Sequence, residues 1–88
     1  MKIKNNFVLR TVAGQTIVAP IGDAAISFNA MISLNESGTF LWKALETETT
    51  EEQLVSALLD EYEVSEDVAL ADVSAFLNKM REAKLLDE

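Results

Sequence analysis

The sequence predicts an α+β domain in which a three-stranded antiparallel sheet is followed by a three-helix bundle. Two observations support this fold class. Residues 7–34 contain short runs rich in β-branched and aromatic side chains, which are typical of strands. Residues 36–84 carry apolar side chains at helical spacing, and residues that favour helix caps precede them. The spacing of apolar side chains changes from strand-like to helical within Met31–Trp42, so this segment is predicted to join the sheet to the helices.

Length and composition limit the class of protein. The 88 residues correspond to one domain, which buries roughly 60–65% of the surface of its unfolded chain. Cysteine and histidine are absent, which excludes disulfides, Cys/His metal sites and histidine acid–base catalysis. The net charge of −8 disfavours nucleic acid as a partner. No apolar run approaches the roughly 20 residues that span a bilayer and no signal-peptide core is present, so a cytoplasmic protein without a membrane partner is expected.

The first two strands are predicted to form a hairpin. Phe7–Val12 and Gln15–Ala19 are the strands, and Ala13-Gly14 lies between them as a turn. Pro20 cannot donate a hydrogen bond within a sheet, so it either ends the second strand or lies at an edge. The third main strand is predicted at Ala30–Leu34, after a short β-like run at Ala24–Phe28.

The first helix is predicted over residues 36–46, directly after Asn35. The side chain of Asn35 can accept hydrogen bonds from the free N–H groups of the first turn. Gly38 in that turn costs about 1 kcal/mol of helix stability relative to alanine, which indicates that another group packs closely there. Trp42 lies off the apolar stripe, so it either packs on the sheet or is partly exposed. The stripe consists of Phe40, Leu41, Ala44 and Leu45.

Two more helices follow a polar linker, and each begins at a predicted cap. Thr50 starts the second helix, where Thr50 and Gln53 fit a capping box. Ser65 caps the third helix. The core-facing residues are predicted to be Leu54, Leu58 and Tyr62 in the second helix, and Ala69, Val73, Phe76, Leu77 and Met80 in the third. Residues 1–6 are expected to be a polar lead-in, and Leu85-Leu86 is expected to fold back on the core.

The third helix has two further flanks beside its core stripe. One flank is apolar at its base and cationic towards its C-terminus, and it consists of Leu70, Ser74, Leu77, Arg81 and Lys84. Its two cations are predicted in the last turn, where they complement the helix dipole. The opposite flank carries Val68, Asp72 and Lys79. Periodicity alone favours an ordinary amphipathic helix whose wide stripe meets two neighbours.

Little in the sequence suggests catalysis. The carboxylates lie at helix caps or on outer helix faces, where a solvated surface is their ordinary role. The glycines form no phosphate loop, and no histidine is present to activate a serine. No calcium-loop spacing and no cofactor signature is visible. An enzyme is therefore disfavoured, and neither a cofactor nor a metal is expected.

Strands followed by three helices also fit a winged helix, a fold that often binds DNA. The third helix would then be the recognition helix, with Glu66, Asp67 and Asp72 in its N-terminal half. These carboxylates would repel phosphates. A fold of this type that binds protein is therefore favoured, and a winged-helix DNA-binding regulator is the alternative.

The segment at residues 29–42, NAMISLNESGTFLW, resembles the signature of PqqD-like proteins, in which a hydrophobic strand leads into an LNxxG…W element. The resemblance extends upstream to Leu9-Arg10 and downstream to Leu85-Leu86, so it spans nearly the whole chain. Three positions depart from the family pattern. Ala30 replaces the usual glycine, Glu46-Thr47-Glu48 replaces a frequent Asp-Gly turn, and Lys84 replaces a glycine that often precedes the last leucines.

This resemblance implies a three-stranded sheet followed by three helices, related to winged helix-turn-helix domains. PqqD-like proteins are similar to the recognition domains for ribosomally made, modified peptides (RiPPs). The resemblance implies that a precursor's leader peptide adds as a strand to the edge of the third strand and lies against the third helix. The domain would then present the precursor to a maturation enzyme, often a radical SAM/SPASM protein that carries the iron–sulfur clusters.

On this basis, specific residues are expected to bind the peptide. They are Ala30, Met31, Ile32, Ser33 and Leu34 on the third strand, and Leu70, Ser74, Leu77, Arg81 and Lys84 on the third helix. Asn35, Gly38 and Trp42 are expected to lock the sheet to the helices. A small enzyme or metal chaperone of the same pathway is a third alternative. The exposed edge strand would also allow a homodimer.

Overall fold

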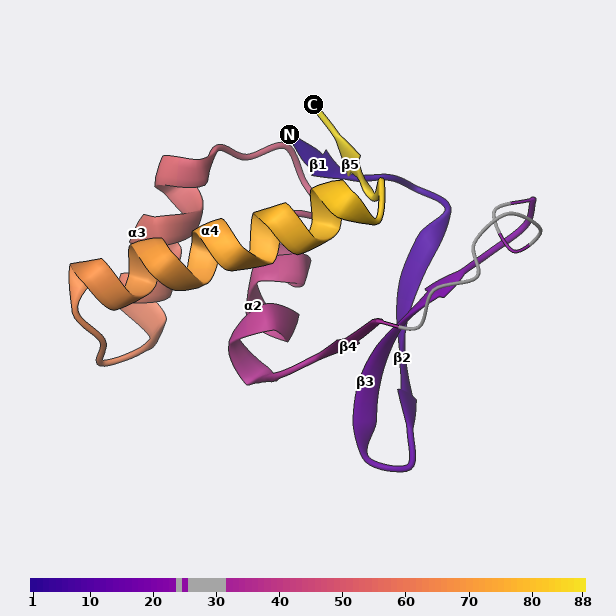
Figure 1. Ribbon diagram of the computed structural model, residues 1–88, viewed down its shortest axis with the longest axis horizontal. Coiled ribbons are helices and arrows are strands. Elements are labelled where there is room, and N and C mark those ends of the chain that lie inside the picture. Colours follow the sequence, from indigo (N-terminus) through magenta and orange to yellow (C-terminus); the bar gives the residue numbers. More distant parts are fainter. Residues whose placement is uncertain (24, 26–31) are drawn as a thin grey trace.

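The computed structural model describes residues 1–23, 25 and 32–88, and it contains a helical layer from which a β-hairpin projects (Figure 1). A three-stranded antiparallel sheet has the order β2 (Phe7–Val12), β3 (Gln15–Pro20) and β4 (Ile32–Leu34). Three helices follow, namely α2 (Glu36–Ala44), α3 (Glu51–Glu61) and α4 (Glu66–Glu82). Among the described residues, no helix is long and apolar enough to cross a membrane.

The predicted hairpin is confirmed, and its turn sets the register of the sheet. Ala13 and Gly14 both have positive φ, at 52° and 79°, as a two-residue type I′ turn requires. Val12 therefore pairs with Gln15, and Arg10 pairs with Ile17. Pro20 is the last residue of β3, which agrees with its inability to donate within the sheet. Of the β-like run predicted at Ala24–Phe28, the structure describes Ala25, which is helical, so the prediction is wrong at this residue; the other residues of the run lie outside the described part of the chain.

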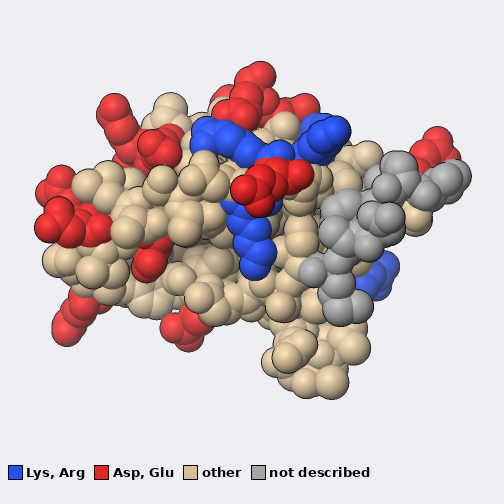
Figure 2. All heavy atoms as spheres, in the orientation of Figure 1, with Lys and Arg blue, Asp and Glu red and all other residues tan. Residues whose placement is uncertain are grey.

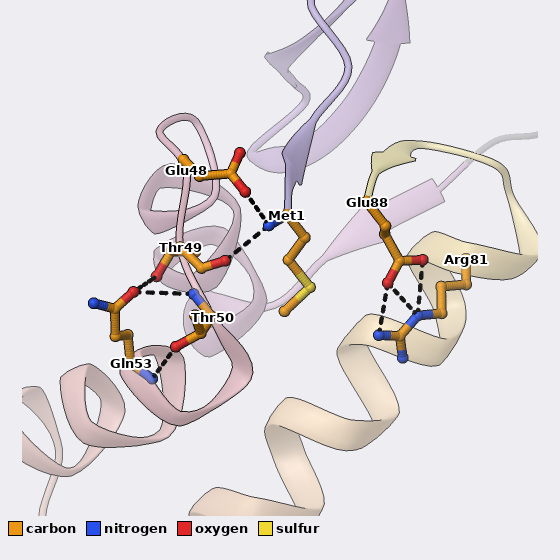
Figure 3. A network of polar contacts seen from close by, with 7 residues as sticks. All are labelled: Met1, Glu48, Thr49, Thr50, Gln53, Arg81 and Glu88. Carbon is orange, nitrogen blue, oxygen red and sulfur yellow. Dashed lines mark hydrogen bonds and ion pairs between the residues drawn. The ribbon is translucent and has the colours of Figure 1, made fainter.

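Each helix begins at the cap that the sequence predicts. The side chain of Asn35 accepts a hydrogen bond of 2.8 Å from the backbone N–H of Gly38. Thr50 and Gln53 form the predicted capping box, with reciprocal hydrogen bonds of 3.2 Å and 3.0 Å (Figure 3). The hydroxyl of Ser65 accepts from the N–H of Val68. These side chains satisfy N–H groups that have no partner within their own helix.

The end of α4 differs from the prediction at one residue. Lys84 was expected in the last turn, but α4 ends at Glu82 and Lys84 lies beyond its cap with φ of 61°. The N–H of Lys84 bonds to the carbonyl of Arg81, and the N–H of Leu85 bonds to that of Met80. This is the Schellman arrangement, whose left-handed residue is usually glycine. The first helix is also shorter than expected, since it ends at Ala44 and not at residue 46.

The two ends of the chain lie side by side, which the sequence did not indicate. β1 (Lys2–Ile3) pairs in antiparallel fashion with β5 (Leu86–Asp87), although residues 1–6 were expected to be only a lead-in (Figure 1). The amino group of Met1 also contacts the carboxylate of Glu48 and donates to the carbonyl of Thr49 at 2.9 Å (Figure 3). These contacts close one end of the helical layer.

One core joins the sheet, the helices and both ends of the chain. Trp42 is 2% exposed and belongs to the core, so it is not partly exposed, the second of its two predicted environments. The predicted stripe of α4 is confirmed, because all five of its residues are buried. Leu85 is fully buried, which confirms the prediction that the chain folds back on the core at this residue. The core consists of Ile3, Val18, Ile32, Leu41, Trp42, Leu45, Leu54, Val55, Leu58, Ala69, Val73, Phe76, Leu77, Met80 and Leu85.

The junction between sheet and helices packs closely around Gly38. A Cβ atom at this position would lie 3.0 Å from Oδ1 of Asn35 and 3.5 Å from Cβ of Leu34. The last residue of β4 and the cap of α2 therefore occupy the space that a larger residue would need. This contact accounts for a glycine in the first turn of a helix.

We expect Asn35→Ala to lower the free energy of unfolding by about 0.5–2 kcal/mol, because the N–H of Gly38 loses its acceptor. For a domain of this size, each kcal/mol corresponds to a decrease in Tm of roughly 4–8 °C. Urea and thermal unfolding followed by circular dichroism measure both quantities. Asn35→Asp keeps an acceptor and should retain most of the stability. An equal loss in both variants would show that the cap is not the cause.

Candidate functional site

The free edge of β4 is the first part of the candidate site. Along a strand of an antiparallel sheet, the backbone N–H and C=O groups of successive residues point alternately to one neighbouring strand and to the other. The two-residue turn directs these groups of Gln15 and Ile17 towards β2, so those of Thr16 and Val18 point towards β4. Ser33 lies opposite Ile17 and therefore directs its backbone N–H and C=O away from β3. Among the described residues, β4 pairs only with β3, so these groups lie at an open edge.

The side chain of Lys79 reaches this edge from α4. Its Nζ donates to the carbonyl oxygen of Ser33 at a distance of 3.3 Å. The contact agrees with the outward direction of that carbonyl, which the strand register gives independently. It also places the C-terminal half of α4 beside β4, although the two residues are far apart in the sequence.

A groove of about 1000 Å³ continues from this edge across the helices. Its apolar side chains include Leu34 from β4, Phe40 from α2 and Phe76 from α4. Tyr62 packs against Phe40 edge to face, with ring centroids 5.7 Å apart. The groove is lined by Gly14, Gln15, Thr16, Ser33, Leu34, Asn35, Glu36, Ser37, Gly38, Thr39, Phe40, Leu41, Lys43, Tyr62, Asp72, Ala75, Phe76 and Lys79.

Charges of both signs line the groove. Lys43 and Lys79 contribute the cations, and Glu36 and Asp72 contribute carboxylates. Partial burial, followed by the carboxylates of Glu36 and Glu61, raises the pKa of Tyr62 above its ordinary value. The phenol is a hydrogen-bond donor and acceptor. Figure 2 shows acidic side chains at the end where α3 and α4 join and along the upper edge of this face, and basic side chains over the C-terminal half of α4 with an acidic side chain among them.

The structure places the expected strand residues in different environments. Ala30 and Met31 lie outside the described residues. Ile32 is only 6% exposed and belongs to the core. Ser33 and Leu34 line the groove, with Ser33 exposed and Leu34 half-buried. Ser33 and Leu34 are thus the described strand residues available to a ligand at this edge.

The expected residues of α4 lie apart from the groove. Leu77 is fully buried, whereas Leu70 and Ser74 are exposed on a flank that does not contribute to the groove lining. Arg81 forms an ion pair of 3.0 Å with Glu88 (Figure 3), and this contact raises the pKa of Arg81 and lowers that of Glu88. Lys84 is exposed beyond the helix end. Peptide contacts by this flank stay a prediction.

The groove instead uses the opposite flank of α4, with Asp72, Ala75, Phe76 and Lys79. Asp72 and Lys79 were assigned to that flank from the sequence but not to the site. Their spacing of seven residues around Phe76 places them on one face of the helix. Spacing alone could not choose between the flanks, because the choice depends on how α4 is rotated relative to β4. Among the described residues, no group of His, Cys, Asp and Glu could hold a metal ion.

The fold and the groove define a small α+β domain of the winged helix-turn-helix type with an open sheet edge beside a helix. A family model described as "Coenzyme PQQ synthesis protein D (PqqD)" matches residues 15–86. The chain belongs to the PqqD family, as the LNESG…W segment indicates, and the predicted fold class is confirmed.

A solved structure has the same fold. It is titled "TbiB1 in Complex with the TbiA(beta) Leader Peptide" and superimposes with a TM-score of 0.74. The sequences are 23% identical, and the match covers 99% of this chain and 95% of that chain. A comparison with curated proteins found no match.

Proposed function

We propose that this protein is a non-catalytic adaptor that binds the leader of a ribosomally made precursor peptide. The leader adds as a strand to the free edge of β4 and lies in the groove beside α4. The outward N–H and C=O of Ser33 carry this proposal, because an added strand would bond to these groups. Membership of the PqqD family and the leader peptide named with TbiB1 also support it.

The edge and the groove have separate roles in this proposal. Any extended peptide can form main-chain hydrogen bonds with Ser33, so these bonds supply affinity without sequence preference. Side chains that point towards α4 meet Phe40, Tyr62 and Phe76, which favour apolar residues. A flexible leader loses conformational entropy when it binds, so we expect a Kd that is micromolar or somewhat lower.

A titration of the ¹⁵N-labelled protein with the leader encoded nearest its gene tests the proposal. We expect chemical-shift changes at Ile32–Leu34 towards values typical of a paired strand, together with changes along the groove. The same spectra test the flank with Leu70 and Ser74, since contacts there would shift its amides. Unchanged shifts at Ile32–Leu34 would overturn strand addition. Salt-sensitive retention on duplex DNA without leader binding would favour the winged-helix regulator instead.

The adaptor would present the bound precursor to a modifying enzyme, and the family resemblance favours a radical SAM/SPASM protein. The adaptor's own residues would bind and orient the leader, while the enzyme supplies the chemistry. Reconstitution of the precursor with its enzyme, with and without this protein, measures this role. We expect slower modification in its absence, and equal rates would contradict presentation.

A further inference from the structure

Lys79 occupies a position that the proposed function does not explain. Its ammonium group donates to Ser33, and the contact is exposed to solvent. In the described part of the chain the ion pairs are Met1–Glu48 and Arg81–Glu88, so Lys79 has no carboxylate partner there. A hydrogen bond that orders a long exposed side chain contributes little free energy. The contact is therefore weak enough for a competitor to displace.

The same contact covers the edge to which a peptide would add. The carbonyl of Ser33 is one of the two groups that an added strand would use at this residue. Lys79 places a charged side chain on the open side of this carbonyl. Lysines at sheet edges hinder pairing with other strands, including those of a second copy of the same chain. In the free protein, Lys79 therefore lies over the carbonyl of Ser33 at this edge.

A bound peptide would leave the ammonium group of Lys79 without its acceptor. The neighbouring side chain of Phe76 offers none. Among the described residues, the groove carboxylates of Glu36 and Asp72 form no ion pair with Lys79, and neither does Glu82, which lies three residues later on α4. A carboxylate on the incoming peptide would supply the charge-assisted hydrogen bond that Lys79 lacks.

We propose that Lys79 is a gate on the edge of β4. It closes the edge against other chains in the free protein, and it pairs with an acidic side chain when a leader binds. The second half of this inference rests on the proposed function, and the first half does not. The gate would make the site select acidic leaders over neutral ones, although the protein itself is acidic.

The first experiment uses no peptide. We expect Lys79→Met to increase self-association at least about tenfold in sedimentation equilibrium, with shift changes at Ile32–Leu34, because the edge loses its charged cover. Arg10→Met removes the same charge from β2, which β3 separates from β4, and should remain like the wild type. Equal behaviour of Lys79→Met and wild type would overturn the closed edge.

The second experiment compares the leader with a copy in which every Asp and Glu is replaced by Asn and Gln. We expect the wild type to prefer the acidic leader about threefold to tenfold, from one charge-assisted contact. Lys79→Met should lose this preference and bind the neutral copy about threefold more tightly than the wild type does. Lys79→Arg should keep the preference.

The outcomes separate the gate from the adaptor function. Equal weakening of both peptides by Lys79→Met, or a leader without acidic residues, would overturn selection by Lys79. If neither peptide binds the wild type or Lys79→Met, the adaptor function and the acidic preference both fail. The self-association of Lys79→Met is then the measurement that tests whether Lys79 closes the edge.

Discussion

Trp42→Ala is expected to lower the free energy of unfolding by about 3–5 kcal/mol, which is a large share of the roughly 5–15 kcal/mol typical of a native domain. Trp42 is 2% exposed and belongs to the core cluster that joins all parts of the fold. Truncation loses the transfer free energy of the indole and leaves a cavity that the surrounding residues can fill only in part. We expect Tm to fall by roughly 12–40 °C.

Urea unfolding followed by circular dichroism measures this change, since the variant loses the chain's single tryptophan and with it the natural fluorescence signal. Leu70→Ala is the matched control, because Leu70 is 47% exposed and alanine favours a helix. The control should stay within about 0.5 kcal/mol of the wild type. A loss of less than about 1 kcal/mol in Trp42→Ala would contradict the central place of the indole in the core.

Local chemistry explains which elements the sequence could predict. The hairpin follows from two runs of strand formers around Ala13-Gly14, and the caps at Asn35 and Thr50 follow from side chains that bond within three residues. The core stripe of α4 follows from its helical period alone. Each of these features depends on residues that are close together in the sequence.

The features that the sequence missed depend on residues that are far apart. β1 and β5 have two residues each, which is too short for any periodic signal, and they form only because the two ends of the chain meet. The groove flank of α4 is set by how α4 packs against α3 and α2, and this packing brings Lys79 to Ser33. The family resemblance directed attention to the third strand and the third helix, but could not fix the rotation of that helix.

Ser33→Pro is expected to weaken leader binding about tenfold to a hundredfold while the domain still folds. Proline removes the N–H of Ser33, so a carbonyl of the added strand loses its donor and is left unpaired on binding. The proline ring also projects from the edge that the peptide approaches. The fold should tolerate the change, because this N–H faces away from β3 and is not needed within the sheet. Isothermal titration with the leader measures the affinity, and circular dichroism checks the fold.

Thr11→Pro is the matched control on the opposite edge of the same sheet. The backbone groups of Arg10 and Val12 point towards β3, so the N–H of Thr11, which lies between them, points away from β3 at the outer edge of β2. Thr11→Pro should show the same loss of stability that a proline on an edge strand causes, and it should leave the affinity for the leader unchanged. Ser33→Ala keeps the N–H and should bind like the wild type. Equal binding by Ser33→Pro and Thr11→Pro would mean that the peptide does not pair with β4. A loss shared by Ser33→Ala would assign the effect to the hydroxyl, whereas a loss confined to Ser33→Pro requires the backbone of the edge itself.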